Sequence, residues 1–472
     1  MSWQVIWEKI YMEFKEIDGF STILIFILAA ALMSGAQTVV TTGLSGIITE
    51  FATNSTTAQW IYSSFLLVLG VMIPTSAFII KRYKIKTIIV SSLAIFVIGC
   101  LISVFAPNIY VLIFSRVIQA FGCGILLPVT QIVLFKSIPE DKWQVFMGLF
   151  GLIIGVAPAI APTFGGLIID YANWRAIFVI LIILAAILLI SGLIFTDLEF
   201  ETGNYSLNLI SLVLTFIACV GIMFGFSNIA VRGFDFTYVI LPIVAGIVAL
   251  IIYVYRERRV ENPLLNLKVL KNKYFVFGTL FSSILFFTMC GINVMMPLFV
   301  QSVAYYSATV SGLIILPGTI IMILFNFVGP LLATKIGVRK VLILSCIFTI
   351  VGFLSMMTYT VQSSVGYMIA TQIIRCIGAG LGLMPAVTWT ISMATDNIED
   401  STAINTTIRQ IIGAIGSAIT VMIMSAFAGG NIGHNQVSVS AFTETSLVMI
   451  ILTVISLIMV LLYIRDKKET IE

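Results

Sequence analysis

The sequence is short of charge. Only 10% of its 472 residues are Asp, Glu, Lys or Arg, whereas 60% are hydrophobic and the mean hydropathy is +1.13. Soluble domains carry about 25% charged residues, so this composition excludes a soluble fold. The net charge of +4, without a basic tract interleaved with aromatics, gives no footprint for nucleic acid. The chain is also too apolar for intrinsic disorder.

Groups that carry enzymatic or metal chemistry are scarce as well. The single histidine, His434, falls in the last predicted external loop, and the six cysteines lie inside apolar runs without CxxC spacing. The cysteines therefore resemble small hydrophobic residues rather than ligands or disulfides, and we predict no metal site and no cofactor. A membrane-embedded protease or lipid transferase would need a polar catalytic constellation at the membrane interface, so we expect no enzyme. No predicted loop is long enough for a soluble sensor domain.

Apolar runs long enough to cross a membrane are abundant. A bilayer core of about 30 Å needs about 20 apolar residues per helix. The predicted fold is an all-α polytopic membrane protein with fourteen transmembrane helices. The predicted spans are 20–46, 58–80, 87–106, 110–134, 146–169, 175–195, 207–230, 237–255, 274–300, 309–332, 340–360, 365–391, 404–428 and 445–464. The long acidic stretch ahead of the first span argues against a cleaved signal peptide.

Basic residues orient the chain, because short cytoplasmic loops are rich in Lys and Arg. With both termini in the cytoplasm, 20 of the 25 basic residues fall on that side and only Arg175 and Arg232 lie outside. We therefore predict a bacterial cell-membrane protein with cytoplasmic N- and C-termini. The N-terminal tail carries aromatic and apolar residues at helical spacing, which favours a helix in the inner interface over a disordered tail.

The chain contains an internal repeat. Segment 115–128 in the fourth span and segment 371–385 in the twelfth each combine an arginine, a Gly-x-Gly and a proline. Two such bundles around a central cavity are the plan of a secondary transporter that works by alternating access. The predicted division is an N-terminal segment, a six-helix bundle, two inserted spans with a linker, a second six-helix bundle and a tail. The boundaries are 1–19, 20–200, 201–273, 274–464 and 465–472.

Arg116 lies inside the fourth span, about 9 Å along the helix axis. A charge at that depth costs about 2.5–3.5 kcal/mol on insertion scales, so it normally faces the protein interior and has a partner. Gln119 lies one turn away on the same side. A functional role inside the helix bundle is one interpretation of these two residues. The alternative is a structural arginine that satisfies loose carbonyl groups between helices.

The fifth span is rich in glycine and proline. Small residues four apart let a neighbouring helix approach closely, and two prolines four apart each remove an intrahelical hydrogen bond. We interpret the span as a bent pivot between the bundles, with simple helix packing as the alternative. The pivot residues are Gly151, Gly155, Pro158, Pro162, Gly165 and Gly166.

Seven motifs in order identify a family resemblance. They are 57–60, Arg116 to Gln119 with Gly122 and Gly124, 158–166, 173–178, 297–301, 311–318 and 408–416. Together they resemble the fourteen-span branch of the major facilitator superfamily, specifically drug exporters of the EmrB/QacA type from Gram-positive bacteria. The resemblance implies drug export in exchange for protons, a role in proton transfer for the Arg116 motif, and an antiporter motif at 151–166.

The sequence also departs from that family. Many relatives carry an aspartate in the first span where this chain has Ala36, and the Asp positions of the loops after spans 2 and 10 are Lys81 and Thr334. No carboxylate falls in the middle of a predicted span. Glu50 and Glu444 are the best candidates for a proton carrier, with ordinary loop acids as the alternative.

Polar residues within spans are candidates for the substrate cavity. Arg375 is the most deeply placed charge, about 15 Å into its span, whereas Arg409 starts its span and could extend its side chain to the inner surface. Three arginines without a carboxylate would give an apolar cavity a positive potential, which favours neutral or anionic amphiphiles. The cavity candidates are Gln37, Thr38, Gln59, Trp60, Asn293, Arg375, Arg409 and Gln410.

We therefore predict a monomeric, proton-coupled exporter of small amphipathic compounds that gives multidrug efflux and antibiotic resistance. The alternative is an exporter of an endogenous lipid, fatty acid, peptide or metabolite, because such a protein would share every feature above.

Overall fold

A computed structural model describes residues 19–53, 55–203, 208–260, 263–306, 308–394, 397–427 and 438–464. The predicted interfacial helix, His434 and the C-terminal tail lie outside these residues. Every regular element within them is helical. Among the described residues, thirteen helices are long and apolar enough to cross a membrane, and a shorter apolar helix covers Ile210–Phe226. The all-α polytopic prediction is therefore confirmed, and the fourteen helices match the fourteen predicted spans in order.

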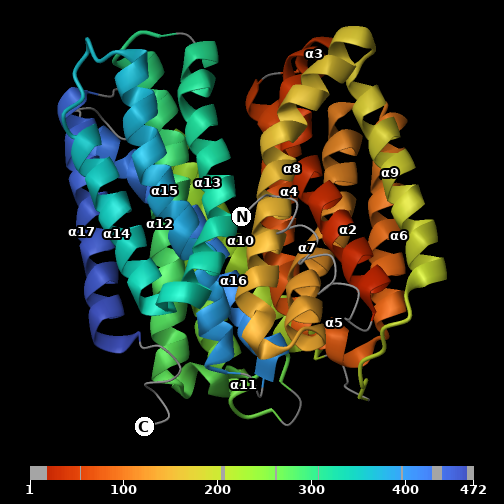
Figure 1. Cartoon of the computed structure of the whole chain (residues 1–472). Coiled ribbons are helices and arrows are strands. Elements are labelled where there is room, and N and C mark those ends of the chain that lie inside the picture. Colours follow the sequence, from red (N-terminus) through yellow and green to blue (C-terminus); the bar gives the residue numbers. More distant parts are fainter. Residues whose placement is uncertain are drawn as a thin grey trace, which may run out of the picture. The chain divides into compact units, whose positions relative to one another are not determined.

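Two compact units divide the chain, Met1–Trp143 with Ile153–Leu207 and Gln144–Leu152 with Asn208–Glu472. In each unit the long helices run side by side (Figure 1). The helices of the first unit are α2 (Phe20–Thr38), α3 (Leu44–Glu50), α4 (Ser55–Met72), α5 (Ser76–Arg82), α6 (Ile85–Val104), α7 (Ile109–Ser137), most of α8 (Trp143–Tyr171) and α9 (Trp174–Phe195).

The second unit contains the remaining helices. They are α10 (Leu209–Arg232), α11 (Leu241–Glu257), α12 (Lys273–Ser302), α13 (Ala308–Ile336), α14 (Val338–Met356), α15 (Val365–Ser392), α16 (Ile398–Phe427) and α17 (Val439–Tyr463). Helices α10 and α11 pack on each other, and α10 also packs on α16. The six–two–six division remains a prediction.

Side-chain caps explain where several helices begin. The Asn108 side chain accepts from the Val111 backbone N–H at the start of α7, and Asn173 accepts from Arg175 and Ala176 at the start of α9. Asn272 caps α12 in the same way. Such caps satisfy backbone N–H groups that have no partner within the helix. In the fourth predicted span a proline, Pro128, lies inside α7 without ending it.

The second predicted span is broken by a short 3-10 segment, Ile73–Thr75, between α4 and α5. Pro74 has no backbone N–H to donate. The hydroxyl groups of Thr75 and Ser76 donate to the carbonyl groups of Met72 and Ile73 at 2.6 Å and 2.7 Å. These bonds supply partners for polar groups that an apolar environment would otherwise leave unsatisfied.

The glycines of the repeated motif allow close packing in both units. A Cβ atom on Gly122 would collide with the Ser92 carbonyl of α6, and one on Gly378 would lie 2.6 Å from the Ser345 carbonyl of α14. Both separations are shorter than real Cβ contacts. The repeat found in the sequence therefore corresponds to equivalent helix packing, α7 on α6 and α15 on α14.

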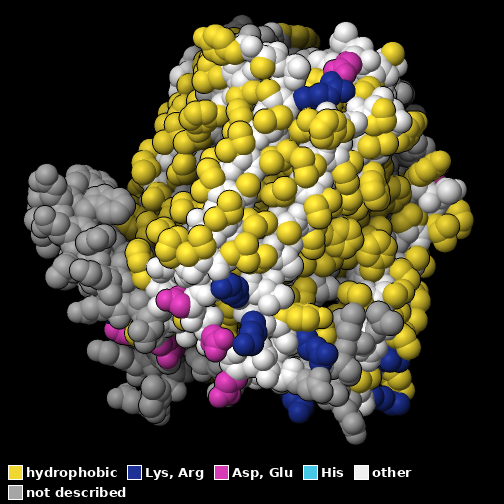
Figure 2. Space-filling model, turned by 90° about the vertical axis from the view of Figure 1, so that its right-hand side faces the viewer, with side chains coloured by type: hydrophobic (Ala, Val, Ile, Leu, Met, Phe, Trp, Pro, Cys, Tyr) yellow, Lys and Arg dark blue, Asp and Glu magenta, His cyan; other side chains and the backbone are white. Residues whose placement is uncertain are grey.

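The outward faces of the helices are apolar. Figure 2 shows hydrophobic side chains over a broad band of one face, with charged side chains mostly near its lower end. On α9 the exposed side chains are almost all aliphatic and include Ile183, Ile187 and Ile194. Exposed apolar surface of this extent suits contact with lipid.

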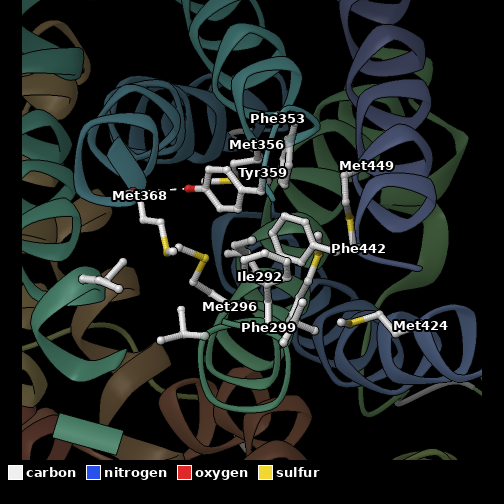
Figure 3. Packing of buried hydrophobic residues seen from close by; sticks show 14 of the residues in the cluster. Ile292, Met296, Phe299, Phe353, Met356, Tyr359, Met368, Met424, Phe442 and Met449 are labelled. Carbon is white, nitrogen blue, oxygen red and sulfur yellow. Dashed lines mark hydrogen bonds between the residues drawn. The ribbon is translucent and has the colours of Figure 1, made fainter. Parts of the chain in front are cut away.

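Inside the second unit, α12, α14, α15, α16 and α17 share a core of methionine and aromatic side chains (Figure 3). The Phe442 ring lies 4.4 Å from Phe299 and 5.3 Å from Tyr359, centroid to centroid. The Tyr359 hydroxyl donates to the Met368 carbonyl at 3.3 Å. This cluster is a packed core to which α15 contributes Met368.

Candidate functional site

Arg116 of α7 is fully buried, and each of its guanidinium nitrogens has a partner. Nη2 donates to the carbonyl of Ala36 in α2 at 3.0 Å, and Nε donates to the carbonyl of Ile61 in α4 at 3.3 Å. Nη1 donates to Gln119 Oε1 at 2.6 Å. The guanidinium also lies 4.3 Å from the centroid of the Phe65 ring. Arg116 thus joins three helices without a carboxylate.

The contacts of Arg116 continue through Gln119 to α6. Gln119 Nε2 donates to Ser103 Oγ at 2.8 Å, and the Ser103 and Ser115 hydroxyls are 2.6 Å apart. All four side chains are buried. A buried polar network whose members all have partners rigidifies its surroundings, and it is sensitive to the loss of any one member.

Ala36 occupies the position at which, by the family resemblance, many drug exporters carry an aspartate. The structure shows that Arg116 binds the main-chain carbonyl at this position, and the Ala36 side chain is itself buried. Two of the three partners of Arg116 are therefore main-chain carbonyl groups, as expected for the alternative of a structural arginine. The role of the network in proton coupling remains a prediction.

Two hydroxyl groups of α2 donate to carbonyl groups that the proline pair of α8 leaves without an intrahelical donor. Pro158 and Pro162 cannot donate to the carbonyls four residues earlier, those of Ile154 and Pro158. Ser34 Oγ donates to the Ile154 carbonyl at 3.3 Å, and Thr38 Oγ1 donates to the Pro158 carbonyl at 2.9 Å. Ser34 and Thr38 are themselves one turn apart, so each supplies the partner that one proline removed. From the sequence we predicted Thr38 as a cavity residue, and its bond to a carbonyl of the proline pair was not foreseen.

The glycines of α8 differ in their surroundings. Gly148 and Gly151 lie in the part of α8 that groups with the second unit, and there they contact Pro330 and Met384. By contrast, an added Cβ on Gly166 would meet nothing within 4 Å. The absence of a side chain at Gly148 and Gly151 therefore permits close packing, whereas a side chain at Gly166 would meet no neighbour. The pivot role of all six residues, Gly151, Gly155, Pro158, Pro162, Gly165 and Gly166, remains a prediction.

Glu50 forms an ion pair at the end of α3. Its Oε1 accepts from Arg175 Nη1, and its Oε2 accepts from Trp174 Nε1 at 2.6 Å. Arg175 also donates to the carbonyls of Val104 and Ala106. Burial acts to raise the pKa of Glu50. The hydrogen bonds from Arg175 and Trp174, together with the positive charge of Arg175, outweigh burial and leave that pKa below its usual value. This geometry favours the alternative of an ordinary loop acid, here held in an ion pair, over a proton carrier.

The second acid candidate, Glu444, lies in the second turn of α17. Its side chain is half-buried, and it has no hydrogen bond or ion pair within the described part of the chain. Glu444 therefore remains a candidate proton carrier.

Arg375 of α15 is buried but less well satisfied than Arg116. Nε donates to Gln372 Oε1 at 3.1 Å, and Nη2 lies 3.0 Å from Cys376 Sγ. Both partners are on its own helix. Nη1 is buried and has no partner among the described residues. Arg375 consequently retains a hydrogen-bond donor that an anionic group could use.

The sequence allowed Arg409 to reach the inner surface, whereas the structure places its side chain inside the fold. Helix α16 begins at Ile398, about 16 Å along the axis from Arg409, so this residue is well inside the helix. Its side chain is only 8% exposed, its guanidinium lies 5.8 Å from the Phe286 ring, and Nη1 has no partner among the described residues.

The other cavity candidates are placed only individually. Gln37, Trp60 and Gln410 are half-buried, and Asn293 is exposed. The Gln59 side chain lies outside the described residues. Their proposed lining of a common cavity remains a prediction.

Two buried acids were missed. The sequence placed Glu257 and Asp400 in cytoplasmic loops, but α11 continues to Glu257 and α16 begins before Asp400. Their side chains are 4% and 1% exposed. The spacing of four between Tyr253 and Glu257 is the signal that could have extended the eighth span by one turn.

Comparison with known proteins identifies the family. The sequence matches the profile described as Major Facilitator Superfamily over residues 26–421. It is 30% identical to the uncharacterized MFS-type transporter YcnB of Bacillus subtilis, over 94% of this chain and 95% of that protein. It is also 30% identical to the lincomycin resistance protein LmrB of Listeria monocytogenes, over 85% of this chain and 86% of that protein.

A solved structure supports the fold. The human organic anion transporter MFSD10 (TETRAN) superposes with a TM-score of 0.64 at 11% identity, over 94% of this chain and 99% of that one. At this identity the likeness shows the fold alone. The chain belongs to the major facilitator superfamily of membrane transporters, and its relatives include drug-resistance proteins.

Proposed function

We propose that the protein is a secondary active exporter of small amphipathic compounds, driven by the proton gradient and working by alternating access between its two bundles. The observation that carries the proposal is the match to resistance proteins over most of the chain. The buried Arg116 network supports it, because a charge so deep in a span marks a substrate or ion pathway more often than a lipid contact. We propose that it acts as a monomer in the bacterial cell membrane with both termini in the cytoplasm.

The substrates are proposed to be neutral or anionic. Arg375 and Arg409 each keep one buried guanidinium nitrogen without a partner among the described residues. A substrate carboxylate or sulfonate could accept from such a donor, and charge-assisted hydrogen bonds are the stronger ones. A dication would meet the opposite field. Export of an endogenous lipid, fatty acid, peptide or metabolite is the second candidate, because the same donors suit its acidic groups.

Purified protein in liposomes tests this function. An imposed pH gradient should drive accumulation of matched neutral and anionic fluorescent amphiphiles more strongly than of monocationic or dicationic ones. Control vesicles without protein, and vesicles with the gradient collapsed, should show no accumulation. Robust transport of dications would contradict the charge preference, whereas transport without dependence on the pH gradient would contradict proton coupling.

Cysteine labelling in intact cells tests the orientation. We expect Lys84→Cys to resist a membrane-impermeant reagent and His434→Cys to react with it, because reversal would place most basic residues outside. The reverse pattern would refute the proposed topology.

A further inference from the structure

Helices α12 and α16 pack on each other along a stripe of buried polar side chains. Asn405 of α16 is fully buried, and its Nδ2 donates to Thr279 Oγ1 at 3.2 Å and to Ser282 Oγ at 3.4 Å, both on α12. One turn later on each helix, the Arg409 guanidinium lies 5.8 Å from the centroid of the Phe286 ring. These contacts place Asn405 and Arg409 on the face of α16 that packs on α12, where residues four apart are neighbours.

The hydrogen bonds of Ser282 determine the orientation of the Asn405 amide. Ser282 Oγ donates its only proton to the Thr279 carbonyl at 3.0 Å, so it can only accept from Asn405. The group of Asn405 that faces these hydroxyls must therefore be the NH2 group, and Oδ1 is the atom that remains. Oδ1 is buried and has no hydrogen-bond partner among the described residues. It is an acceptor with unused capacity at a defined position.

Arg409 offers the complementary group one turn further along α16. Its Nη1 is also buried without a partner among the described residues, so the donor of Arg409 and the acceptor of Asn405 do not bond to each other. Arg409 has no ion pair within the described part of the chain. A buried charge is strongly unfavourable unless it is neutralised, so this position favours an anionic oxygen. Residues four apart on a helix have Cβ atoms about 6 Å apart, which one small head group can span.

We propose that Asn405 and Arg409 form a subsite for the head group of the exported compound, and that this subsite selects an anionic group with a hydroxyl beside it. The inference deepens the proposed function and rests on it. The anionic oxygen accepts from Arg409 Nη1 and the hydroxyl donates to Asn405 Oδ1, so both unused atoms gain a partner. Thr279 and Ser282 hold the amide in the orientation that this requires. Asn405 then determines specificity, because a compound without the hydroxyl leaves Oδ1 unsatisfied.

Two sulfonates of equal charge test the subsite in liposomes that contain the full-length protein. One is a dodecane sulfonate with a hydroxyl group on its third carbon, and the other is the same sulfonate without the hydroxyl. The readout is the hydroxyl preference, which is the transport rate of the first compound divided by that of the second. Because the two charges are equal, the proposed contribution of Arg375 to charge preference cancels. The wild type should prefer the hydroxyl compound roughly fivefold, as expected for one net hydrogen bond.

Variants separate the two members of the subsite. Asn405→Leu should reduce the hydroxyl preference to about one, and Thr279→Val should reduce it part of the way, because the amide loses one of the acceptors that orient it. Arg409→Gln should slow both sulfonates roughly tenfold and leave the preference in place. Thr407→Val is the matched control, because this half-buried hydroxyl donates to the Ala403 carbonyl of its own helix. It should keep the wild-type preference.

The outcomes separate the inference from the function on which it rests. Equal transport of both sulfonates by the wild type would overturn the subsite and leave an ordered water as the partner of the two atoms. Transport of neither sulfonate by a protein that exports other amphiphiles would also overturn it. Equal loss of both compounds in Asn405→Leu would show a structural role for Asn405 and overturn its assignment to specificity.

If the wild type exports no amphiphile at all, the proposed function fails, and binding in detergent then decides the subsite. The hydroxyl compound should raise the midpoint of thermal unfolding of the wild type more than the compound without the hydroxyl, and the two should act equally on Asn405→Leu. Equal shifts of the wild-type midpoint would overturn the inference.

Discussion

Arg116 and Arg375 occupy the two copies of one repeat but have different surroundings. The packing of Gly99 on Gln119 and of Gly352 on Arg375 makes those two partners equivalent. Aligned on the paired glycines Gly122 and Gly378, the first copy reads Arg then Gln and the second reads Gln then Arg. The arginine and glutamine have exchanged places, one turn apart along the helix.

The exchange explains why one guanidinium is saturated and the other is not. From its position on α7, Arg116 reaches main-chain carbonyls of α2 and α4. Arg375 has partners only on α15, and its Nη1 has none among the described residues. This difference is the basis of our proposal that Arg116 has a framework role and that Arg375 offers a donor to the substrate, and the following changes test it.

The largest effect is expected at Arg116. Arg116→Ala leaves Gln119 Oε1 and the carbonyls of Ala36 and Ile61 without the donor that Arg116 supplies. Each unsatisfied buried acceptor costs about 1–3 kcal/mol, so we expect transport to fall by roughly 100-fold. All substrates should be affected alike. Arg116→Lys should restore only part of the rate, because lysine lacks the planar fork that reaches three partners. Transport assays at equal membrane expression check this, and wild-type rates in the Ala variant would contradict a framework role.

The pivot proposed for α8 comes next. Gly155→Leu adds a bulky side chain to a helix that small residues allow to pack, so the alternation should stall while substrate binding survives. Gly166→Ala is the matched control, because the added methyl group meets nothing within 4 Å. Turnover in vesicles and substrate binding in detergent are the two readouts. Unimpaired turnover of Gly155→Leu would remove the pivot interpretation.

Removal of a proline partner should have a moderate effect that is confined to the first unit. Thr38→Val deletes the donor to the Pro158 carbonyl, and an unsatisfied buried carbonyl costs about 1–3 kcal/mol. The midpoint of thermal unfolding in detergent should fall. Ser91→Ala should change it little, because among the described residues the Ser91 hydroxyl bonds only to the Ile88 carbonyl of its own helix. Equal unfolding midpoints for both variants would show that the hydrogen bond from Thr38 to the Pro158 carbonyl does not stabilise the fold.

The smallest effect is expected at Glu50. Its pKa is lowered in the folded protein, so the stabilisation from its ion pair is complete above the unfolded value of 4.5 and is lost as the pH falls through the folded value. Glu50→Gln should therefore leave the pH profile of transport between about pH 5.5 and 8 unchanged. A shift of the pH profile of transport in this range would instead support Glu50 as a proton carrier.

Periodicity and length were sufficient to predict the spans and the repeat, because apolar runs and Gly-x-Gly motifs are local in sequence. The partners were not predictable. That Ser34 and Thr38 bind the carbonyls freed by Pro158 and Pro162 depends on the register between α2 and α8, which single-sequence periodicity does not contain. Glu257 and Asp400 were assigned to loops because charge at the end of an apolar run usually marks a helix end, whereas here α11 extends to Glu257 and α16 begins before Asp400.

The central claim is best tested by one ratio, the transport of an anionic amphiphile divided by that of its matched neutral analogue. Wild type, Arg116→Ala and Arg375→Gln should be measured in the same liposome preparation. We predict that Arg375→Gln lowers this ratio roughly tenfold, because a hydrogen bond to a charged group contributes about 1.5–3 kcal/mol. Arg116→Ala should lower both rates and leave the ratio unchanged. A ratio that falls in Arg116→Ala and stays constant in Arg375→Gln would contradict the assignment of the two arginines.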